Sequence, residues 1–330
     1  MINYFFVMKQ LVNIHEIRNA YKRISNYTVK TPLLSSGLLN QKYNANIFVK
    51  AENLQKIGAF KFRGAINSIL QLKKDQKKVL AWSSGNHAQA IASAAYLNKK
   101  EAIIVMPEDS PKAKLEGTRA WGAKIVTFNR YKESREELGL KIAREENAII
   151  IPPFDDPKVI NGQGTAGYEM INQCEELQIQ PDLVLCCCGG GGLIAGISTA
   201  LLSKFPNLPI YAVEPENYND TKLSLEQNKI VEVDVTNKSI CDALLAPKPG
   251  EITFNINKNN LAGALLVSDQ EAMYAMKTAF EYLKIVLEPG GAVALAAAIK
   301  HKIDIKNKNV LIVASGGNVD KDVFEKSLLI

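Results

Sequence analysis

Short apolar runs alternate with longer helix-forming segments along almost the whole chain, and this alternation restricts the folds that it can adopt. The apolar runs predict strands at Ile47–Lys50, Val79–Trp82, Ala102–Met106, Lys124–Phe128, Ala148–Pro152, Leu183–Cys188, Ile210–Glu214 and Val310–Ala314. The intervening segments predict helices at His87–Leu97, Lys112–Trp121, Glu133–Asn147, Gly164–Leu177, Leu193–Phe205, Asp269–Leu283 and Gly291–His301, while Asn217–Pro249 is the longest irregular segment. Apolar strands that alternate with helices are typical of parallel sheets covered on both faces.

Composition narrows the kind of partner that the protein can have. The 330 residues are 47% hydrophobic, which is enough to build one large or two smaller domains. The net charge of +6 is scattered, whereas a nucleic-acid-binding protein usually carries its basic residues in a stripe. No run approaches the roughly 20 apolar residues that span a bilayer, and the start lacks the features of a signal peptide. We therefore expect a cytoplasmic protein that binds an anionic small molecule, and neither nucleic acid nor membrane.

Three of the five cysteines, Cys186, Cys187 and Cys188, are consecutive within one predicted strand. Neighbouring residues of a strand point to opposite faces, so these thiols cannot surround a metal or pair efficiently in disulfides. We interpret them as small buried hydrophobic residues of a protein in a reducing compartment.

Three loops that follow predicted strands are rich in glycine and small polar residues. They are Ser83-Ser84-Gly85-Asn86-His87, Gly189-Gly190-Gly191-Gly192 and Ser315-Gly316-Gly317-Asn318. Parallel strands place their carboxyl ends at one edge of a sheet, so these loops can converge on one ligand. The first loop also precedes a helix, where its N–H groups and the helix dipole would suit a carboxylate, although ordinary helix capping explains Ser and Asn equally well.

The four glycines of the second loop allow the backbone to wrap closely around an anion at a helix N-terminus. The loop is not a P-loop, because no Gly-Lys-Ser/Thr follows it. However, Gly190-x-Gly192-x-x-Ala195 matches a dinucleotide-binding fingerprint, and Glu214 ends the next strand, where a ribose-binding acid would lie. A nicotinamide-dependent dehydrogenase and a non-catalytic binding protein therefore stay open as alternatives at this point.

Lys61 is a candidate nucleophile. Phe60 and Phe62 flank it, and Gly58 and Gly64 bracket the segment, which is an unusual setting for a surface lysine. Apolar surroundings lower the pKa of a lysine by desolvation and leave its amine reactive. The ordinary alternative is a solvated side chain.

Taken in series, the segment around Lys61 and the three loops resemble the serine racemase and threonine/serine dehydratase family of fold type II pyridoxal-phosphate (PLP) enzymes. The resemblance runs from Thr31 to Asp320, with Ala59 where the family frequently has serine. It implies an α/β fold of two open, mostly parallel twisted sheets covered by helices, like the tryptophan synthase beta chain. Residues 1–77 and 156–330 would form a large PLP-binding domain, and residues 78–155 a small domain that supplies the substrate-carboxylate loop. It also implies a homodimer.

The same resemblance implies which residues hold the cofactor. Lys61 would form a Schiff base with PLP, and Phe60 would pack against the ring. Asn86 would hydrogen-bond the phenolic oxygen, and Ser315 would face the pyridine nitrogen. The residues that would cradle the phosphate are Gly189, Gly190, Gly191, Gly192 and the Leu193 amide.

For the reaction, the resemblance implies dehydration and deamination of L-threonine or L-serine to a 2-oxo acid and ammonia, with Lys61 removing the α-proton. Ser84 occupies the position of the opposite-face serine of racemising members, so serine racemase is one alternative. Arg135 aligns with an arginine of serine racemase and hydroxyaspartate dehydratases, where it could pair with a second substrate carboxylate, or else form a surface ion pair. Hydroxyaspartate dehydratase is thus another alternative. The residues implied for substrate binding are Ser83, Ser84, Gly85, Asn86, His87 and Arg135.

A second cofactor is implied by Glu214 and Asp220, which with the Tyr218 carbonyl resemble the family's divalent-cation site. Two carboxylates, a carbonyl and water suit a hard cation such as Mg²⁺, Mn²⁺ or Ca²⁺. The alternative is a plain acidic surface turn. The metal interpretation removes Glu214 from the ribose role and weakens the dehydrogenase alternative.

Overall fold

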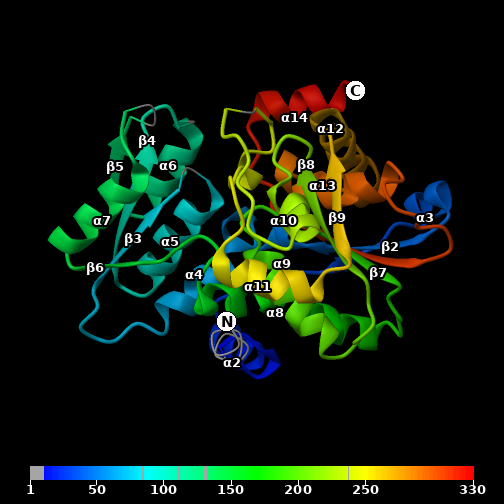
Figure 1. Cartoon of the computed structure of the whole chain (residues 1–330), viewed down its shortest axis with the longest axis horizontal. Coiled ribbons are helices and arrows are strands. Elements are labelled where there is room, and N and C mark those ends of the chain that lie inside the picture. Colours follow the sequence, from blue (N-terminus) through cyan, green and yellow to red (C-terminus); the bar gives the residue numbers. More distant parts are fainter. Residues whose placement is uncertain (1–10, 84, 111, 130–131, 237) are drawn as a thin grey trace.

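The structure is a computed structural model that describes residues 11–83, 85–110, 112–129, 132–236 and 238–330. The described residues form one six-stranded and one four-stranded sheet, each flanked by helices (Figure 1). The α/β fold with two open, mostly parallel sheets is therefore confirmed. Within these ranges no helix combines the length and the apolar character needed to cross a membrane.

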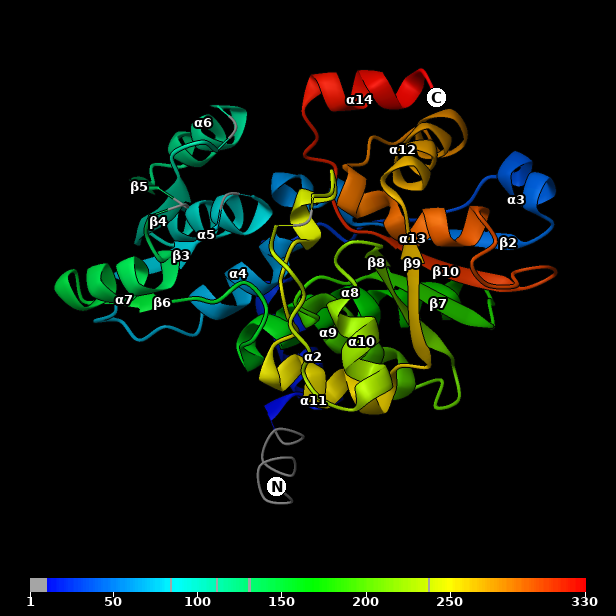
Figure 2. The ribbon, with the colours of Figure 1, turned by 45° about the horizontal axis from the view of Figure 1, so that its top comes forward.

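The large sheet has the strand order β1 (Leu33–Leu34), β2 (Asn46–Ala51), β10 (Asn309–Ala314), β7 (Leu183–Cys187), β8 (Ile210–Pro215) and β9 (Gly263–Val267). All neighbours pair in parallel except β1, which is antiparallel to β2. Every residue of β7 is buried, so the sheet needs cover on both faces. Helices α8 (Pro157–Glu176) and α9 (Gly192–Leu202) cover one face, and α12 (Asp269–Thr278) and α13 (Pro289–Ile299) cover the other (Figure 2).

The small sheet has the parallel order β5 (Lys124–Phe128), β4 (Glu101–Pro107), β3 (Lys78–Trp82) and β6 (Ala148–Ile150). Its helices are α5 (Asn86–Leu97), α6 (Lys112–Ala120) and α7 (Arg135–Glu145). In β3, Val79 and Ala81 join the cluster with α5, whereas Leu80 joins the cluster with α7, as the two-residue period of a strand requires. All four strands come from within residues 78–155, although those domain boundaries stay a prediction.

The remaining elements complete the large part. They are α2 (Ile14–Ile24), α3 (Gly37–Tyr43), α4 (Lys61–Ile69), α10 (Asp220–Gln227), α11 (Glu251–Asn260), α14 (Lys321–Leu328), three 3₁₀ turns at Glu52–Leu54, Lys56–Gly58 and Asp242–Leu244, and a π turn at Ala279–Leu283. Helix α4 lies between the two sheets and packs against both α5 and α8. It is therefore placed to hold the two parts of the chain together.

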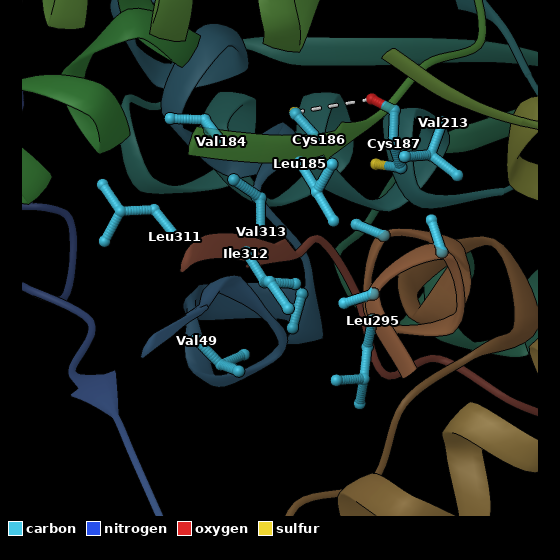
Figure 3. Packing of buried hydrophobic residues seen from close by; sticks show 14 of the residues in the cluster. Val49, Val184, Leu185, Cys186, Cys187, Val213, Leu295, Leu311, Ile312 and Val313 are labelled. Carbon is cyan, nitrogen blue, oxygen red and sulfur yellow. Dashed lines mark hydrogen bonds between the residues drawn. The ribbon is translucent and has the colours of Figure 1, made fainter. Parts of the chain in front are cut away.

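The main core lies between the large sheet and its helices (Figure 3). Val49 of β2, Ile312 of β10 and Leu295 of α13 are no more than 1% exposed, and burial of one such side chain stabilises a fold by about 1.5–3 kcal/mol. The five cysteines belong to this interior, since each is buried and free. The interpretation of the consecutive thiols as small hydrophobic residues is confirmed.

Several predicted boundaries were wrong. The helix predicted from Gly164 begins at Pro157, because Asp156 caps it by accepting hydrogen bonds from the next amides at 2.8 and 3.0 Å. Strand β6 ends at Ile150, since the prolines that follow have no N–H to donate. The segment predicted as irregular, Asn217–Pro249, contains α10, and the predicted helix Asp269–Leu283 changes to a π turn at Ala279.

Candidate active site

One pocket opens where the carboxyl ends of β3, β7 and β10 meet, and the candidate residues from both sheets line it. The lining includes Phe60, Lys61, Ser83, Gly85, Asn86, His87, Arg135, Gly189, Gly190, Gly191, Gly192, Leu193 and Ser315. Ser84 lies outside the described residues, so its roles stay a prediction. The fold thus brings together the described residues that the sequence singled out for cofactor and substrate, and leaves the three candidate metal ligands elsewhere.

Lys61 is the first residue of α4 and reaches into this pocket. Its Nζ donates a hydrogen bond of 2.7 Å to the Pro153 carbonyl and lies 5.1 Å from the centre of the Phe60 ring. Desolvation in the pocket lowers the pKa of Lys61 to about 8, against the opposing effect of Cys187 and Glu288. The amine is therefore partly neutral near physiological pH, as a nucleophile or base requires.

The glycine loop is shaped for an anion. Gly191 has a φ of 90°, in the left-handed region that glycine adopts without strain, and it caps α9 with no side-chain hydrogen bond. A Cβ atom on Gly190 would lie 2.3 Å from the Phe154 ring. The glycine loop therefore has room for backbone atoms but not for a side chain at position 190. The first N–H groups of α9, which no side chain caps, are available to bind a phosphate. This cradle and Lys61 in one pocket fit PLP.

The loop at the start of α5 is also suited to an anion. Gly85 caps the helix without a side-chain hydrogen bond, and its own N–H donates to Ser83 Oγ at 3.2 Å. His87 Nε2 lies 2.9 Å from the Ile151 carbonyl, so it carries the proton and donates. Burial is the main reason that the pKa of His87 is lowered to about 3, and the positive charge of Lys61 adds to this lowering. The His87 side chain is therefore neutral and directed at Ile151, which leaves the loop amides to bind a carboxylate.

A buried glutamate that the sequence did not indicate stands behind this loop. Glu288 is 2% exposed, and its Oε1 accepts a hydrogen bond of 2.6 Å from Asn86 Nδ2. Asn318 Nδ2 in turn donates to Asn86 Oδ1 at 2.7 Å. The Asn86 amide is therefore fixed in one orientation. Glu288 precedes Pro289 at the start of α13, where an acidic helix cap is ordinary, so the sequence alone carried no signal for this role.

The Ser315 loop is joined to the lysine segment by backbone contacts. The Phe60 N–H donates to the Ser315 carbonyl at 3.0 Å, and Ala59 forms a bridge with Gly316. Ser315 is buried and lines the pocket together with Cys187. The end of β10 therefore fixes Ser315 close to Lys61, although the two are far apart in the sequence.

Arg135 supplies a positive charge on the wall that the small sheet contributes. It is the first residue of α7, its side chain is 51% exposed, and its Nε lies 3.5 Å from Glu136 Oε1. Arg135 thus forms the surface ion pair considered from the sequence and also lines the pocket. A half-exposed ion pair of this length is weak, so the guanidinium can turn to another carboxylate.

The three candidate metal ligands lie at the end of β8 and the start of α10. The fully buried Glu214 carboxylate accepts hydrogen bonds from the N–H groups of Thr221 and Lys222, at 2.8 and 2.9 Å. Both Asp220 oxygens are buried with no hydrogen-bond partner in the described structure. Burial raises the pKa of Glu214 to about 7. Burial is also the main reason that the pKa of Asp220 rises to about 9, and the neighbouring charge of Glu214 adds to this rise.

Two buried acids close together in the chain have the chemistry that a small hard cation prefers, with a carbonyl and water as further ligands. The described residues contain no cluster of three or more His, Cys, Asp or Glu side chains suited to a metal. The described structure also does not bring Glu214 to the pocket, so the ribose role considered from the sequence has no support.

Comparisons with known proteins agree with this geometry. A family described as pyridoxal-phosphate dependent enzyme matches residues 24–316, which displaces the nicotinamide dehydrogenase alternative. L-threo-3-hydroxyaspartate ammonia-lyase of Saccharomyces cerevisiae is 43% identical over 307 residues, or 92% of this chain and 93% of that protein. Serine racemase of Schizosaccharomyces pombe is 42% identical over 92% of this chain and 94% of that protein. The solved structure of T.th. threonine deaminase has a TM-score of 0.89 at 40% identity, covering 93% of this chain and 99% of that one. Similar levels of identity thus accompany three different activities.

Proposed function

The chain belongs to the pyridoxal-phosphate dependent enzymes, and within that family we propose that it is an ammonia-lyase whose preferred substrate is 3-hydroxyaspartate. More broadly it is a PLP-dependent enzyme of small amino acids, of the ammonia-lyase or racemase kind. The observation that carries the substrate proposal is Arg135, a cation on the wall of the pocket that contains Lys61. The sequence alone favoured threonine or serine, which have no second carboxylate for this cation.

The pocket residues divide between cofactor and substrate. Lys61, Phe60, Asn86, Ser315 and the glycine loop would hold PLP, which when bound supplies an electron sink for a substrate carbanion. The amides at the start of α5 would hold the α-carboxylate, since they are uncapped and carry the positive end of the helix dipole. Arg135 would take the second carboxylate.

Lys61 would then remove the α-proton. Its pKa of about 8 leaves a useful neutral fraction at physiological pH. Confinement beside the substrate supplies much of the rate, because a base held in place reacts far faster than a free one. The neutral His87 does not compete for this proton, since its pKa of about 3 makes it a poor base. The products would be a 2-oxo acid and ammonia.

The substrate proposal is tested by assaying 2-oxo acid from L-threo-3-hydroxyaspartate, L-threonine and L-serine. Arg135→Ala should lower kcat/KM for hydroxyaspartate roughly tenfold, because a half-exposed ion pair is screened by water, and leave threonine almost unaffected. Lys132→Ala is the matched control, since it removes an exposed positive charge near by that does not line the pocket. Equal loss on all three substrates, or D-serine as the main product from L-serine, would sink the proposal.

We also propose that Glu214, Tyr218 and Asp220 bind a divalent cation. The buried Asp220 carboxylate without a hydrogen-bond partner supports this, because a buried acid costs free energy unless a cation or a donor meets it. A bound cation would hold the end of β8 and the start of α10 together. It lies outside the pocket, so we assign it a structural role.

A further inference from the structure

Four charged side chains are enclosed between β2, α4 and α8, outside the pocket and outside every step proposed above. Lys50, Glu52, Arg63 and Glu169 are each no more than 1% exposed. Two are positive and two are negative, so the group has no net charge. We call these four residues the buried quartet.

Arg63 is the centre of the quartet. Its Nε and Nη2 donate to the two oxygens of Glu52, both at 2.8 Å. Its Nη1 and Nη2 donate to the two oxygens of Glu169, again both at 2.8 Å. The guanidinium is therefore held on two sides by paired hydrogen bonds, an arrangement that only the planar fork of arginine can make.

Lys50 balances the charge from the far side. Its Nζ donates to Glu169 Oε2 at 2.6 Å, to the Thr31 carbonyl at 2.7 Å and to Gln173 Oε1 at 3.0 Å. Lys50 lies on β2, and none of these three hydrogen bonds reaches α4. The quartet thus contains two cations in equal burial, of which only Arg63 belongs to the helix of Lys61.

Such a group is a poor source of stability, because taking ions out of water offsets most of their attraction. What it does supply is a fixed geometry. Helix α4 has no side-chain cap at its start, where Lys61 is the first residue and Arg63 the third. The doubly held guanidinium is therefore a strong restraint on the turn that carries Lys61.

Close backbone contacts extend this restraint to the glycine loop. A Cβ atom on Gly162 of α8 would lie 2.7 Å from Gly64 Cα of α4, and one on Gly196 of α9 would lie 2.5 Å from the Gly164 amide of α8. The backbones of α4, α8 and α9 thus touch without side chains between them. Since α9 begins at the glycine loop, the position of α4 sets the distance from Lys61 to that loop.

We infer that Arg63 is a positioning residue that sets Lys61 at the distance from the glycine loop that PLP requires. PLP would be held at both ends, its aldehyde by Lys61 and its phosphate by the loop, so a shift of α4 would spoil the fit. This inference rests on the proposed attachment of the cofactor to Lys61. Arg63 itself is not among the described residues that line the pocket.

The test compares Arg63→Met with Lys50→Met, each of which removes one buried cation from the same quartet. Three quantities are measured on the full chain: the melting temperature without cofactor, the dissociation constant of PLP by absorbance, and the fraction of Lys61 labelled after borohydride reduction, by mass spectrometry. Both variants should melt at similarly lowered temperatures. Only Arg63→Met should weaken PLP binding, by roughly tenfold or more, which corresponds to about 1.4 kcal/mol.

Arg63→Lys keeps the charge and serves where Arg63→Met does not fold. Its ammonium lacks the planar fork that pairs with two carboxylates on two sides, so it should fold and give intermediate labelling of Lys61. Equal PLP affinity in the Lys50 and Arg63 variants, or full labelling in both Arg63 variants, would overturn the inference. Absence of labelling at Lys61 in the unmutated protein would instead refute the assignment of Lys61, and thereby identify which of the two ideas failed.

Discussion

At the scale of single residues, the reactivity of Lys61 depends on its protonation. Burial lowers the pKa of Lys61 to about 8 from the ordinary 10.5, so its amine becomes neutral as the pH rises through about 8. We expect the rate at which the cofactor-free protein captures PLP to rise with pH and to level off above about 8, measured by the visible absorbance of the lysine-bound cofactor. Lys61→Ala should show no such absorbance and no turnover.

The lowered pKa of Lys61 also makes the stability of the fold depend on pH. Between about 8 and 10.5 the unfolded chain binds a proton at this position that the folded chain does not, so the Lys61 contribution to stability rises with pH across that window. His87, with a pKa of about 3, does not titrate there and cannot imitate the effect. A midpoint of PLP capture near 10.5 would show that the pocket does not desolvate the lysine.

Among the residues, the sequence indicated those whose type is unusual for their place, such as Lys61 between aromatic rings or four consecutive glycines. It could not indicate Glu288, because a buried acid and an ordinary helix cap look the same in sequence. It also could not show that the His87 side chain is directed at the Ile151 carbonyl, since that contact depends on where the chain runs after β6.

At the scale of elements, the glycine loop has no room for a side chain. Gly190→Ala would place a Cβ atom 2.3 Å from the Phe154 ring, and such overpacking costs about 1–3 kcal/mol. We expect lower PLP affinity and a lower melting temperature. Gly37→Ala at the start of α3 is the matched control, because nothing lies within 4 Å of its Cβ position. Unchanged PLP binding by Gly190→Ala would argue against a phosphate in this loop.

The loop between β8 and α10 gives a separate prediction. Adding Mg²⁺, Mn²⁺ or Ca²⁺ to chelator-treated protein should raise its melting temperature, since a ligand present at 100 times its Kd stabilises the folded state by about 2.7 kcal/mol. Asp220→Asn should abolish the response, because an amide lacks the anionic oxygen that a hard cation prefers, while the protein still folds, because the amide is uncharged and similar in size. The same response in Asp220→Asn would place the cation at another site.

The strands were predicted well and some helices were not, for a physical reason. Strands such as β7 are buried at every residue, so an uninterrupted apolar run identifies them. Helix α4 is buried almost all round yet carries Arg63, Asn67 and Ser68, whose polar groups are enclosed by other elements. It therefore has no apolar stripe for a pattern to detect. Strand β9, a short edge strand that begins at Gly263, was missed likewise.

At the scale of the whole molecule, the pocket takes residues from both sheets. The lysine, the glycine loop and Ser315 come from the large sheet side, whereas the loop at α5 and Arg135 come from the small sheet side. The order of the motifs in the sequence indicated this convergence, because parallel strands align their carboxyl ends. The contacts between the two parts could not be predicted, since they depend on helix α4.

The resemblance to the serine racemase and dehydratase family predicts a homodimer. We expect light scattering on the eluting protein to give about twice the chain mass of 36.3 kDa. A monomer with full activity would contradict the dimer and leave the assignment of the pocket intact.

The touching backbones of α4, α8 and α9 also limit how such a chain can diversify. A side chain at Gly162 or Gly196 would force whole helices apart, so the part proposed to hold the cofactor can change little without losing that function. The wall proposed for the substrate has no such restriction, because Arg135 is half exposed at the start of α7, on the side of the small sheet. The proposed roles thus predict that a few substitutions on the wall around Arg135 redirect one inherited chemistry to another substrate, and overall identity alone is then a poor guide to the substrate.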